Sequence, residues 1–220
     1  MGNNQSYILT QRINVILLLI TLVYVASNKN VRYDNLQTLA VFNLIISLVD
    51  YLPMLYISNP NSKTGWAFEG VRYIDWLITT PINTYVIWYF FIVVNNPHLE
   101  SQFPYWQLIL PVILNNFMSL LVWYSKYTHQ SQNTIMLFTV LGWIFLAISI
   151  YQVIRLTNLV QQNNGPNTLL TGYFLIGTWI GYTIAQSTPD PTLRYTINNI
   201  VDLFAKIIFL YYFSFYFTMV

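Results

Sequence analysis

Charged side chains are scarce in this sequence. They make up 7% of its 220 residues, whereas 55% of the residues are hydrophobic. Soluble domains carry about 25% charged residues, so the composition excludes an ordinary soluble domain. Helices of roughly 20–28 residues with short connections leave room for about seven spans, and the alternating segments of about 10 residues that build a membrane β-barrel are absent. The predicted fold class is an all-α membrane protein, a single domain formed by a seven-transmembrane-helix bundle.

Cysteine is absent as well, which excludes disulfides, thiolate catalysis and cysteine metal sites. His98 and His129 both fall in polar connections, so a histidine metal cluster is not expected. The formal net charge is only +2 and no basic run exists, which argues against a nucleic-acid partner. No nucleophile with an adjacent base is visible, and no enzymatic activity is predicted.

Polar or proline-containing turns separate the apolar segments. Val25-Ala26-Ser27 could mimic a signal-peptidase site, but cleavage there would leave only about six spans. Pro81 should kink its helix and free a backbone carbonyl for a neighbouring helix. Loop lysines and arginines are spread over both sides and do not fix the orientation. The predicted helices are residues 8–27, 36–58, 66–94, 103–124, 134–156, 169–186 and 192–218.

Lys206 lies alone in the apolar run that ends the sequence. An ammonium group at the middle of a membrane helix costs roughly 2.5–3.5 kcal/mol on insertion scales, so it serves chemistry or is paired. Asp202 precedes it by one turn on the same helix face. A buried lysine beside a carboxylate can form a Schiff base with an aldehyde and neutralise the resulting cation.

Two predicted helices carry polar and charged residues at three- and four-residue spacing, which places each set on one face. If the two faces meet, the buried group holds two cations and two anions, and burial requires such neutrality. An ion-pair network that only joins the helices explains each pair equally well. The residues are Arg72, Asp75 and Thr79 on the third helix and Asn199, Asp202 and Lys206 on the last.

The third helix reads Arg72-Tyr73-Ile74-Asp75-Trp76-Leu77-Ile78-Thr79-Thr80-Pro81. Together with Asp-x-x-x-Lys on the last helix, this pattern resembles the bacteriorhodopsin-like microbial rhodopsins. The resemblance covers the whole chain in order, although the fourth and fifth helices contribute little beyond hydrophobicity. The small size and the many asparagines look most like the rhodopsins of giant viruses.

The resemblance implies a retinal-binding photoreceptor protein. All-trans retinal would be bound to Lys206 as a protonated Schiff base. Asp75 would be the counterion and primary proton acceptor, and Asp202 the second counterion. Arg72 would face the extracellular half of the pathway, and Thr79 would hydrogen-bond Asp75.

The resemblance also implies a retinal pocket. Trp76 and Trp179 would sandwich the polyene, because flat apolar indoles suit a long conjugated chain. Tyr51 matches a tyrosine that contacts the second counterion in this family. Thr80 and Trp143 complete the expected pocket, although an ordinary core aromatic explains Trp143 equally well.

Several positions depart from the family's pattern. Its proton pumps carry a carboxylate donor about two turns past the Thr-Thr-Pro, where this chain has Val86. They often hold a release glutamate towards the outer end of the last helix, where this chain has Arg194. The sixth helix keeps Trp179 from the family's Trp-x-x-Tyr-Pro-x-x-Trp. The other places of that pattern are taken here by Gly172, Leu175 and Ile176.

A polar stripe runs along the otherwise apolar second helix, formed by Asn43, Ser47 and Asp50. Bilayer physics places such a stripe towards the bundle interior or a water-filled cavity. One explanation is hydrogen bonding that holds the second helix to the first and last. The other is a hydrated pathway, which could be extended by Asn14, Asn83 and Asn199.

Three functions follow from these patterns. A light-gated cation channel is favoured, because of the polar stripe and because the viral branch includes such channels. A light-driven outward proton pump and a photosensory receptor acting through a partner protein are the alternatives. The expected partners are the lipid bilayer, retinal, inorganic cations or protons, and further copies of the chain in a homo-oligomer. The resemblance places the N-terminus outside the cell and the C-terminus in the cytoplasm.

Overall fold

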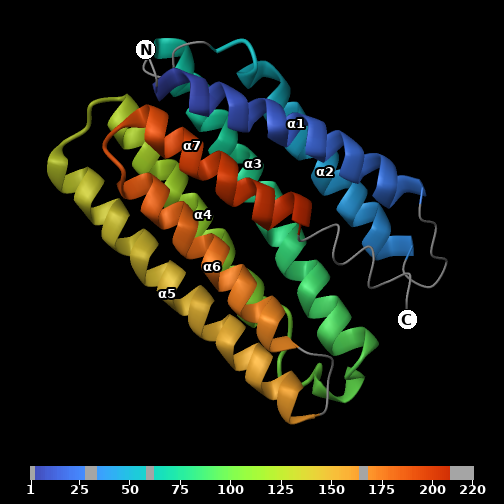
Figure 1. Ribbon diagram of the computed structural model, residues 1–220. Helices are drawn as coiled ribbons and strands as arrows, with labels where there is room; N and C mark the ends of the chain where they lie inside the picture. Colours follow the sequence, from blue (N-terminus) through green and yellow to red (C-terminus); the bar gives the residue numbers. More distant parts are fainter. Residues whose placement is uncertain (1–2, 28–33, 58–61, 164–167, 209–220) are drawn as a thin grey trace. The chain divides into compact units, whose positions relative to one another are not determined.

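The computed structural model describes residues 3–27, 34–57, 62–163 and 168–208, which form seven α-helices and no β-strand (Figure 1). This confirms the predicted all-α fold class. Two π-helical segments, η2 and η4, continue the third and seventh helices, and a short 3₁₀ turn, η3, precedes the fourth. The elements are α1 (Asn3–Ser27), α2 (Asp34–Met54), α3 (Lys63–Trp88), η2 (Tyr89–Val94), η3 (Pro97–Leu99), α4 (Trp106–Tyr127), α5 (Gln132–Gln162), α6 (Thr168–Ser187), α7 (Pro191–Asp202) and η4 (Leu203–Ile208).

The chain divides into two compact units. The first unit combines Met1–Phe68 with Gly177–Val220, and the second is Glu69–Ile176. The first unit therefore holds α1, α2, the second half of α6, α7 and η4. The second unit holds most of α3, η2, η3, α4, α5 and the first half of α6.

Five helical stretches among the described residues are long and apolar enough to cross a membrane. The other two predicted spans correspond to α6 and to α7 with η4, and residues 209–220 of the last one lie outside the described part of the chain. The chain is an integral membrane protein. The five stretches are Gln5–Ser27, Asn35–Met54, Ala67–Val94, Trp106–Tyr127 and Gln132–Gln162.

In the first unit, α1 packs along α2 and against α7 (Figure 1). Apolar residues on the contacting faces are buried, among them Leu18 on α1 and Leu44 on α2. The second half of α6 packs against α7 at Gly181, where an added Cβ would lie 2.7 Å from a methyl carbon of Val201. Only a glycine at this position allows the two helices to approach so closely.

The end of α2 falls at Met54, earlier than the predicted end at residue 58. Pro53 has no N–H to continue the helical ladder. The N–H groups of Leu55, Tyr56 and Ile57 then bond to carbonyls three residues back, at 3.0–3.2 Å. This tighter turn closes the helix. Residue 58 itself lies outside the described residues.

In the second unit, α3 runs through Pro81 and changes to the π-helical η2 at Tyr89. Wider π turns leave carbonyl groups that need other donors. The side-chain amides of Asn95 and Asn96 supply them, donating to the carbonyls of Phe90 and Phe91 at 2.5 and 2.9 Å. The two asparagines thereby end the segment at the predicted position.

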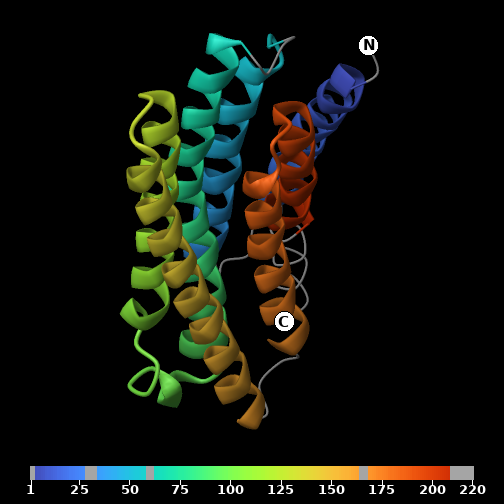
Figure 2. The same cartoon turned by 90° about the vertical axis from the view of Figure 1, so that its left-hand side faces the viewer.

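Helices α4 and α5 lie side by side in the second unit (Figure 2). α4 continues to Tyr127, three residues past its predicted end at 124. It ends in a Schellman motif, with Gln130 N–H donating to Ser125 O at 2.9 Å and His129 in the left-handed region at φ 53°. The Ser131 hydroxyl then caps α5 by accepting the N–H of Thr134 at 3.2 Å.

The start of α7 follows from its sequence. Pro191 occupies the first turn, where its missing N–H costs nothing. The carboxylate of Asp190 accepts the N–H of Thr192 at 2.9 Å and so caps the helix. This pair fixes where the helix that leads to Lys206 begins.

Candidate functional site

Lys206 lies in the π-helical segment η4 and is buried. Its Nζ is 3.5 Å from Oδ1 of Asp202, and the two side chains are only 3% and 2% exposed. Removing a charge from water is costly, so a buried ammonium requires an anionic partner of this kind. Single-turn π segments within helices are frequent at functional sites. The pair predicted from i, i+4 spacing is therefore formed.

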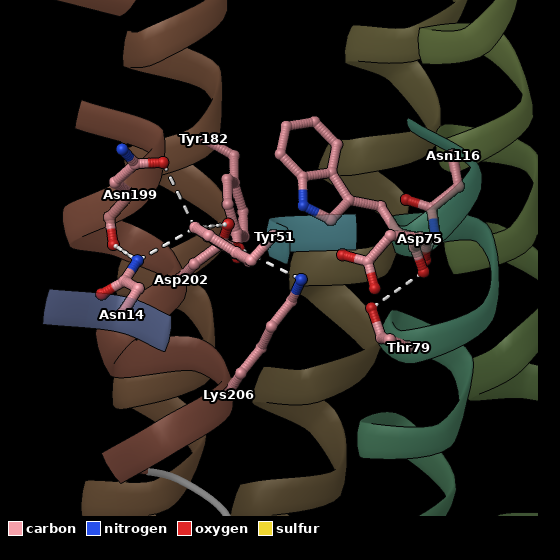
Figure 3. Close-up of polar contacts among 10 residues, drawn as sticks. Asn14, Tyr51, Asp75, Thr79, Asn116, Tyr182, Asn199, Asp202 and Lys206 are labelled. Carbon is pink, nitrogen blue, oxygen red and sulfur yellow. Dashed lines mark hydrogen bonds and ion pairs between the residues drawn. The ribbon is translucent and has the colours of Figure 1, made fainter. Parts of the chain in front are cut away.

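Asp202 accepts hydrogen bonds from two tyrosines of the first unit (Figure 3). The hydroxyl of Tyr51 on α2 donates to Oδ2 at 2.6 Å. The hydroxyl of Tyr182 on α6 donates to Oδ1. Hydrogen bonds to an ionised acceptor are short and strong, so the two phenols stabilise the carboxylate in its anionic form.

Asn14 on α1 joins this cluster through both hydrogens of its amide (Figure 3). Its Nδ2 donates to the Tyr51 hydroxyl at 2.9 Å and to the backbone carbonyl of Asn199 at 2.6 Å. The Asn199 side chain in turn donates to the hydroxyl of Thr10 at 3.1 Å. One continuous hydrogen-bonded network thus connects α1, α2, α6 and α7 to the anion beside Lys206.

Polar side chains are buried on each of the three helices α1, α2 and α7. Ser47 Oγ, Gln11 Nε2 and Asn198 Oδ1 have no hydrogen-bond partner among the described residues. Buried polar atoms are normally paired with protein or water, so these atoms indicate a polar interior rather than a dry seam. The residues exposed by 3% or less are Gln11, Asn14 and Thr21 on α1, Asn43, Ser47 and Asp50 on α2, and Asn198, Asn199 and Asp202 on α7.

The charged face of α3, which belongs to the second unit, is buried. Arg72, Asp75 and Thr79 are exposed by 1%, 3% and 1%. The Thr79 hydroxyl donates to the backbone carbonyl of Asp75 at 2.9 Å. The expected bond between these two residues is thus made to the main chain, because a threonine hydroxyl reaches the carbonyl four residues back within its own helix.

Trp76 follows Asp75 and is buried, with 7% of its surface exposed. The side-chain amide of Asn116 on α4 donates to the Trp76 carbonyl at 2.9 Å. The ring of Tyr73 packs edge-on at 5.2 Å between centroids. Sequence reasoning missed Asn116. The signal that could have found it is a polar residue inside an apolar helix.

The other expected pocket residues fall in different surroundings. Trp179, in the first unit, is 7% exposed, and Thr80, in the second, is half-buried. Trp143 on α5 is 51% exposed, so its own unit does not enclose it. Val86, where the pumps of the family carry a carboxylate, is fully buried.

Tyr182, whose hydroxyl contacts Asp202, is a further residue that the sequence analysis missed. The family's Trp-x-x-Tyr-Pro-x-x-Trp can be matched forwards from Trp179, which places its tyrosine at Tyr182. Thr183 and Gln186 then take the places of the proline and the second tryptophan. This match stands beside the placement on Gly172, Leu175 and Ile176.

Glu69 is a further residue to which the sequence analysis assigned no role. It is 3% exposed and precedes Arg72 by three residues on α3. The i, i+3 spacing of an acid and an arginine was the signal available in the sequence. Arg194, at the expected place of a release glutamate, is buried at 6% exposure in the first unit.

No family model and no curated protein matches the sequence. Solved structures do match over nearly the whole chain. Thermophilic rhodopsin has a TM-score of 0.79 at 16% identity and covers 99% of this chain and 94% of its own. The bromide-bound halorhodopsin from Halobacterium salinarum has a TM-score of 0.77 at 14% identity, with 99% and 95% covered. The viral rhodopsin OLPVRII has a TM-score of 0.66 at 21% identity, with 100% of both chains covered. The chain has the fold of the microbial rhodopsins.

Proposed function

We propose that this protein binds retinal at Lys206 and moves ions across a membrane in response to light, in the favoured form as a light-gated cation channel. The observation that carries the proposal is the buried ion pair of Lys206 with Asp202, which two tyrosines complete. It occurs in a chain that has the fold of the microbial rhodopsins, and the sequence resemblance to that family implies retinal held by this lysine.

The residues around Lys206 fit an aldehyde ligand. The amine is shielded from water, and a carboxylate 3.5 Å away can neutralise the cation that forms when the amine condenses with an aldehyde. Retinal bound there would supply light absorption and an isomerisation that displaces the lysine nitrogen. The resemblance assigns the walls of the pocket to Trp76, Trp179, Thr80 and Trp143. Trp143 has the least support, because it is exposed whereas Trp76 and Trp179 are buried.

The resemblance also assigns the proton that leaves the Lys206 nitrogen to the carboxylate of Asp75. The hydrogen bonds at Asp202 support this division of roles. Its two oxygens accept from Tyr51 and Tyr182, which stabilises the anion. Asp202 is therefore suited to remain charged, whereas Asp75 takes up the proton. Arg72, one turn from Asp75, is suited to respond to that change in charge.

The channel form is supported by the buried polar residues on α1, α2 and α7. Asp50 is 2% exposed, and an ionised carboxylate at that depth is costly unless water or a cation reaches it. Ser47, on the same face, has no hydrogen-bond partner for its hydroxyl among the described residues. A wet path along Asn43, Ser47 and Asp50 would hydrate the Ser47 hydroxyl and conduct cations.

The pump form has less support. A pump must reload the lysine nitrogen with a proton from the cytoplasmic side while the outer side is closed. The residue at the donor place is Val86, which is apolar and fully buried. Proton uptake would then depend on water and would be slow. The sensor form needs a partner protein, for which no surface of the described residues gives specific support.

Voltage-clamp recording of cells that express the protein with all-trans retinal tests the proposal. Under illumination, a channel gives a current that reverses sign with the cation gradient. A current of one sign at every voltage would replace the channel by the pump. A coloured protein without photocurrent would replace both by the sensor. The matched control is Lys206→Ala, which should give no photocurrent at all.

A further inference from the structure

We infer that Asn14 is a positioning residue. It couples the carboxylate of Asp202, the anion beside Lys206, to its own helix α1, which packs against α2 and α7. The inference rests on the proposed function, because it concerns how retinal bound at Lys206 would act on the protein. Asn14 is 2% exposed and lies within the first unit together with Tyr51 and Asn199, to which it donates. No residue of the family pattern used above corresponds to it.

The first contact sets the direction of the Tyr51 proton. A phenol hydroxyl has one hydrogen to donate and lone pairs to accept. Because Asn14 Nδ2 donates to the Tyr51 oxygen at 2.9 Å, that oxygen acts as an acceptor and its own hydrogen is directed elsewhere. Asp202 Oδ2 at 2.6 Å is a closer acceptor than Asn199 Oδ1 at 3.3 Å. Asn14 thereby strengthens the hydrogen bond that Tyr51 gives to the anion.

The second contact lies where α7 changes to the π-helical η4. Asn14 Nδ2 donates to the Asn199 carbonyl at 2.6 Å, and the same carbonyl accepts the N–H of Leu203, the first residue of η4. A carbonyl oxygen has two lone pairs and can accept both. The amide of Asn14 therefore holds the turn from which Lys206 projects, one helical turn further on.

These two contacts give α1 a direct connection to the lysine and to its anion. A displacement of η4 or of the Tyr51 side chain changes the length of a hydrogen bond to Asn14. α1 packs against α2 and α7 and also carries Gln11 and Thr21, which are buried. Motion at Lys206 is thereby transmitted to a wall of the proposed conduction path.

Asn14 would make the same hydrogen bonds if it only held α1 to α7. The test therefore needs a readout at the chromophore. The absorption maximum of the retinal-loaded protein is such a readout, because it depends on the charge beside the lysine. Asn14→Leu removes both amide hydrogens at nearly constant volume. Asn14→Asp keeps the size and polarity and replaces the donors by acceptors, which turns the Tyr51 hydrogen towards residue 14.

We expect both substitutions to shift the maximum in the same direction as Tyr51→Phe. Asn14→Leu should produce about half of the Tyr51→Phe shift, and the Asn14→Leu/Tyr51→Phe double variant should shift no further than Tyr51→Phe alone, because the two residues act through one bond. In voltage clamp, the rise of the photocurrent should slow at least about threefold in Asn14→Leu.

Thr10→Val is the matched control. It removes the other hydrogen bond between α1 and Asn199, from the Asn199 side chain to Thr10 Oγ1 at 3.1 Å, and leaves both Asn14 contacts in place. Its absorption maximum should stay at the wild-type value. A shift as large as that of Asn14→Leu would reduce Asn14 to one of several bonds between two helices and overturn the inference.

The outcomes separate this inference from the proposed function. If the wild-type chain forms no pigment with retinal, the proposed function is wrong. If it forms pigment but Asn14→Asp and Asn14→Leu keep the wild-type maximum, only the role of Asn14 is wrong. Additive shifts in the double variant would also contradict it. Asn14→Asp decides the matter if Asn14→Leu does not fold.

Discussion

Two helix interfaces in this protein use their polar residues in opposite ways. On α5, which packs against α4, the buried hydroxyl of Ser149 bonds back to its own helix, to Phe145 O at 2.8 Å. Among α1, α2 and α7, the side chains bond across helices, from Asn14 to α7 and from Tyr51 to Asp202. The exposed side chain of Arg155 on α5 also donates to Oε1 of Gln107 on α4 at 2.8 Å. The buried part of the first interface relies on packing, whereas the second is built from groups that can exchange partners.

The apolar content of the two interfaces agrees with this difference. Buried residues of α4 and α5 are mainly aliphatic, such as Leu108, Val112, Val153 and Leu156. Packing of this kind tolerates little motion, because interiors are as dense as molecular crystals. A hydrogen-bonded interface can substitute water for a side-chain partner at small net cost. Movement and conduction are therefore expected at α1, α2 and α7, with α4 and α5 as the fixed side of their unit.

The largest expected effect is loss of the pigment in Lys206→Ala. Without the amine no covalent link to retinal can form, so the visible absorption band should disappear completely. Absorption spectroscopy after addition of all-trans retinal, followed by bleaching with hydroxylamine, measures it. Lys126→Ala, which removes the lysine in the last turn of α4, should keep the band. A visible band that survives in Lys206→Ala would refute the assignment.

Next in size is a loss of stability from Leu156→Ala on α5. Leu156 is 2% exposed, and truncation of a buried leucine leaves a cavity that costs about 2–5 kcal/mol. The temperature at which the pigment bleaches should fall, while the absorption maximum and the reversal potential of the photocurrent stay unchanged. An altered reversal potential would show that α5 takes part in conduction and would break the contrast drawn above.

Asp50→Asn should do the reverse of Leu156→Ala, changing the photocurrent while the stability stays nearly the same. It removes the charge from the polar stripe of α2 but keeps its shape, so we expect a photocurrent about tenfold smaller or a changed cation selectivity at nearly constant bleaching temperature. Asp190→Asn, an exposed aspartate that caps α7, is the control and should keep the selectivity. Unchanged conductance and selectivity in Asp50→Asn would remove α2 from the pathway.

The smallest and sharpest test compares two buried serines. Ser47 has no hydrogen-bond partner for its hydroxyl among the described residues, whereas Ser149 donates to its own helix. Ser47→Ala should reduce the photocurrent about two- to threefold, because a pathway hydroxyl is lost. Ser149→Ala should leave it unchanged and alter stability by no more than about 1 kcal/mol. Equal effects of the two substitutions would erase the difference between the interfaces.

Sequence reasoning reached the parts of the site that lie within single helices. The pairing of Lys206 with Asp202 and the stripe of Asn43, Ser47 and Asp50 follow from spacing alone, because 3.6 residues per turn place them on one face. The all-α fold class follows from the scarcity of charge. The ends of α2 and α4 differ from the predicted ends by a few residues, since a proline turn after α2 and a Schellman motif with His129 after α4 depend on local backbone geometry.

Contacts between helices were harder to predict. Tyr182 on Asp202, Asn116 on the Trp76 carbonyl and Asn14 on the Asn199 carbonyl each join residues that are distant in sequence. A polar residue inside an apolar helix is expected to be buried and partnered, but its polarity does not name the partner. The change from α7 to the π-helical η4 was also beyond the sequence patterns used, because it depends on which carbonyls find other donors.

By itself the sequence determined that this is a membrane protein of helices, with a lysine and an aspartate on one face of the last one. Only the tertiary structure decided that the aspartate receives two phenols and that an asparagine on α1 reaches both the tyrosine and the turn before the lysine. The physical reason is that helix geometry fixes neighbours within a turn. The rotation and register of one helix against the next are set by packing over their whole length, as at Gly181 against Val201.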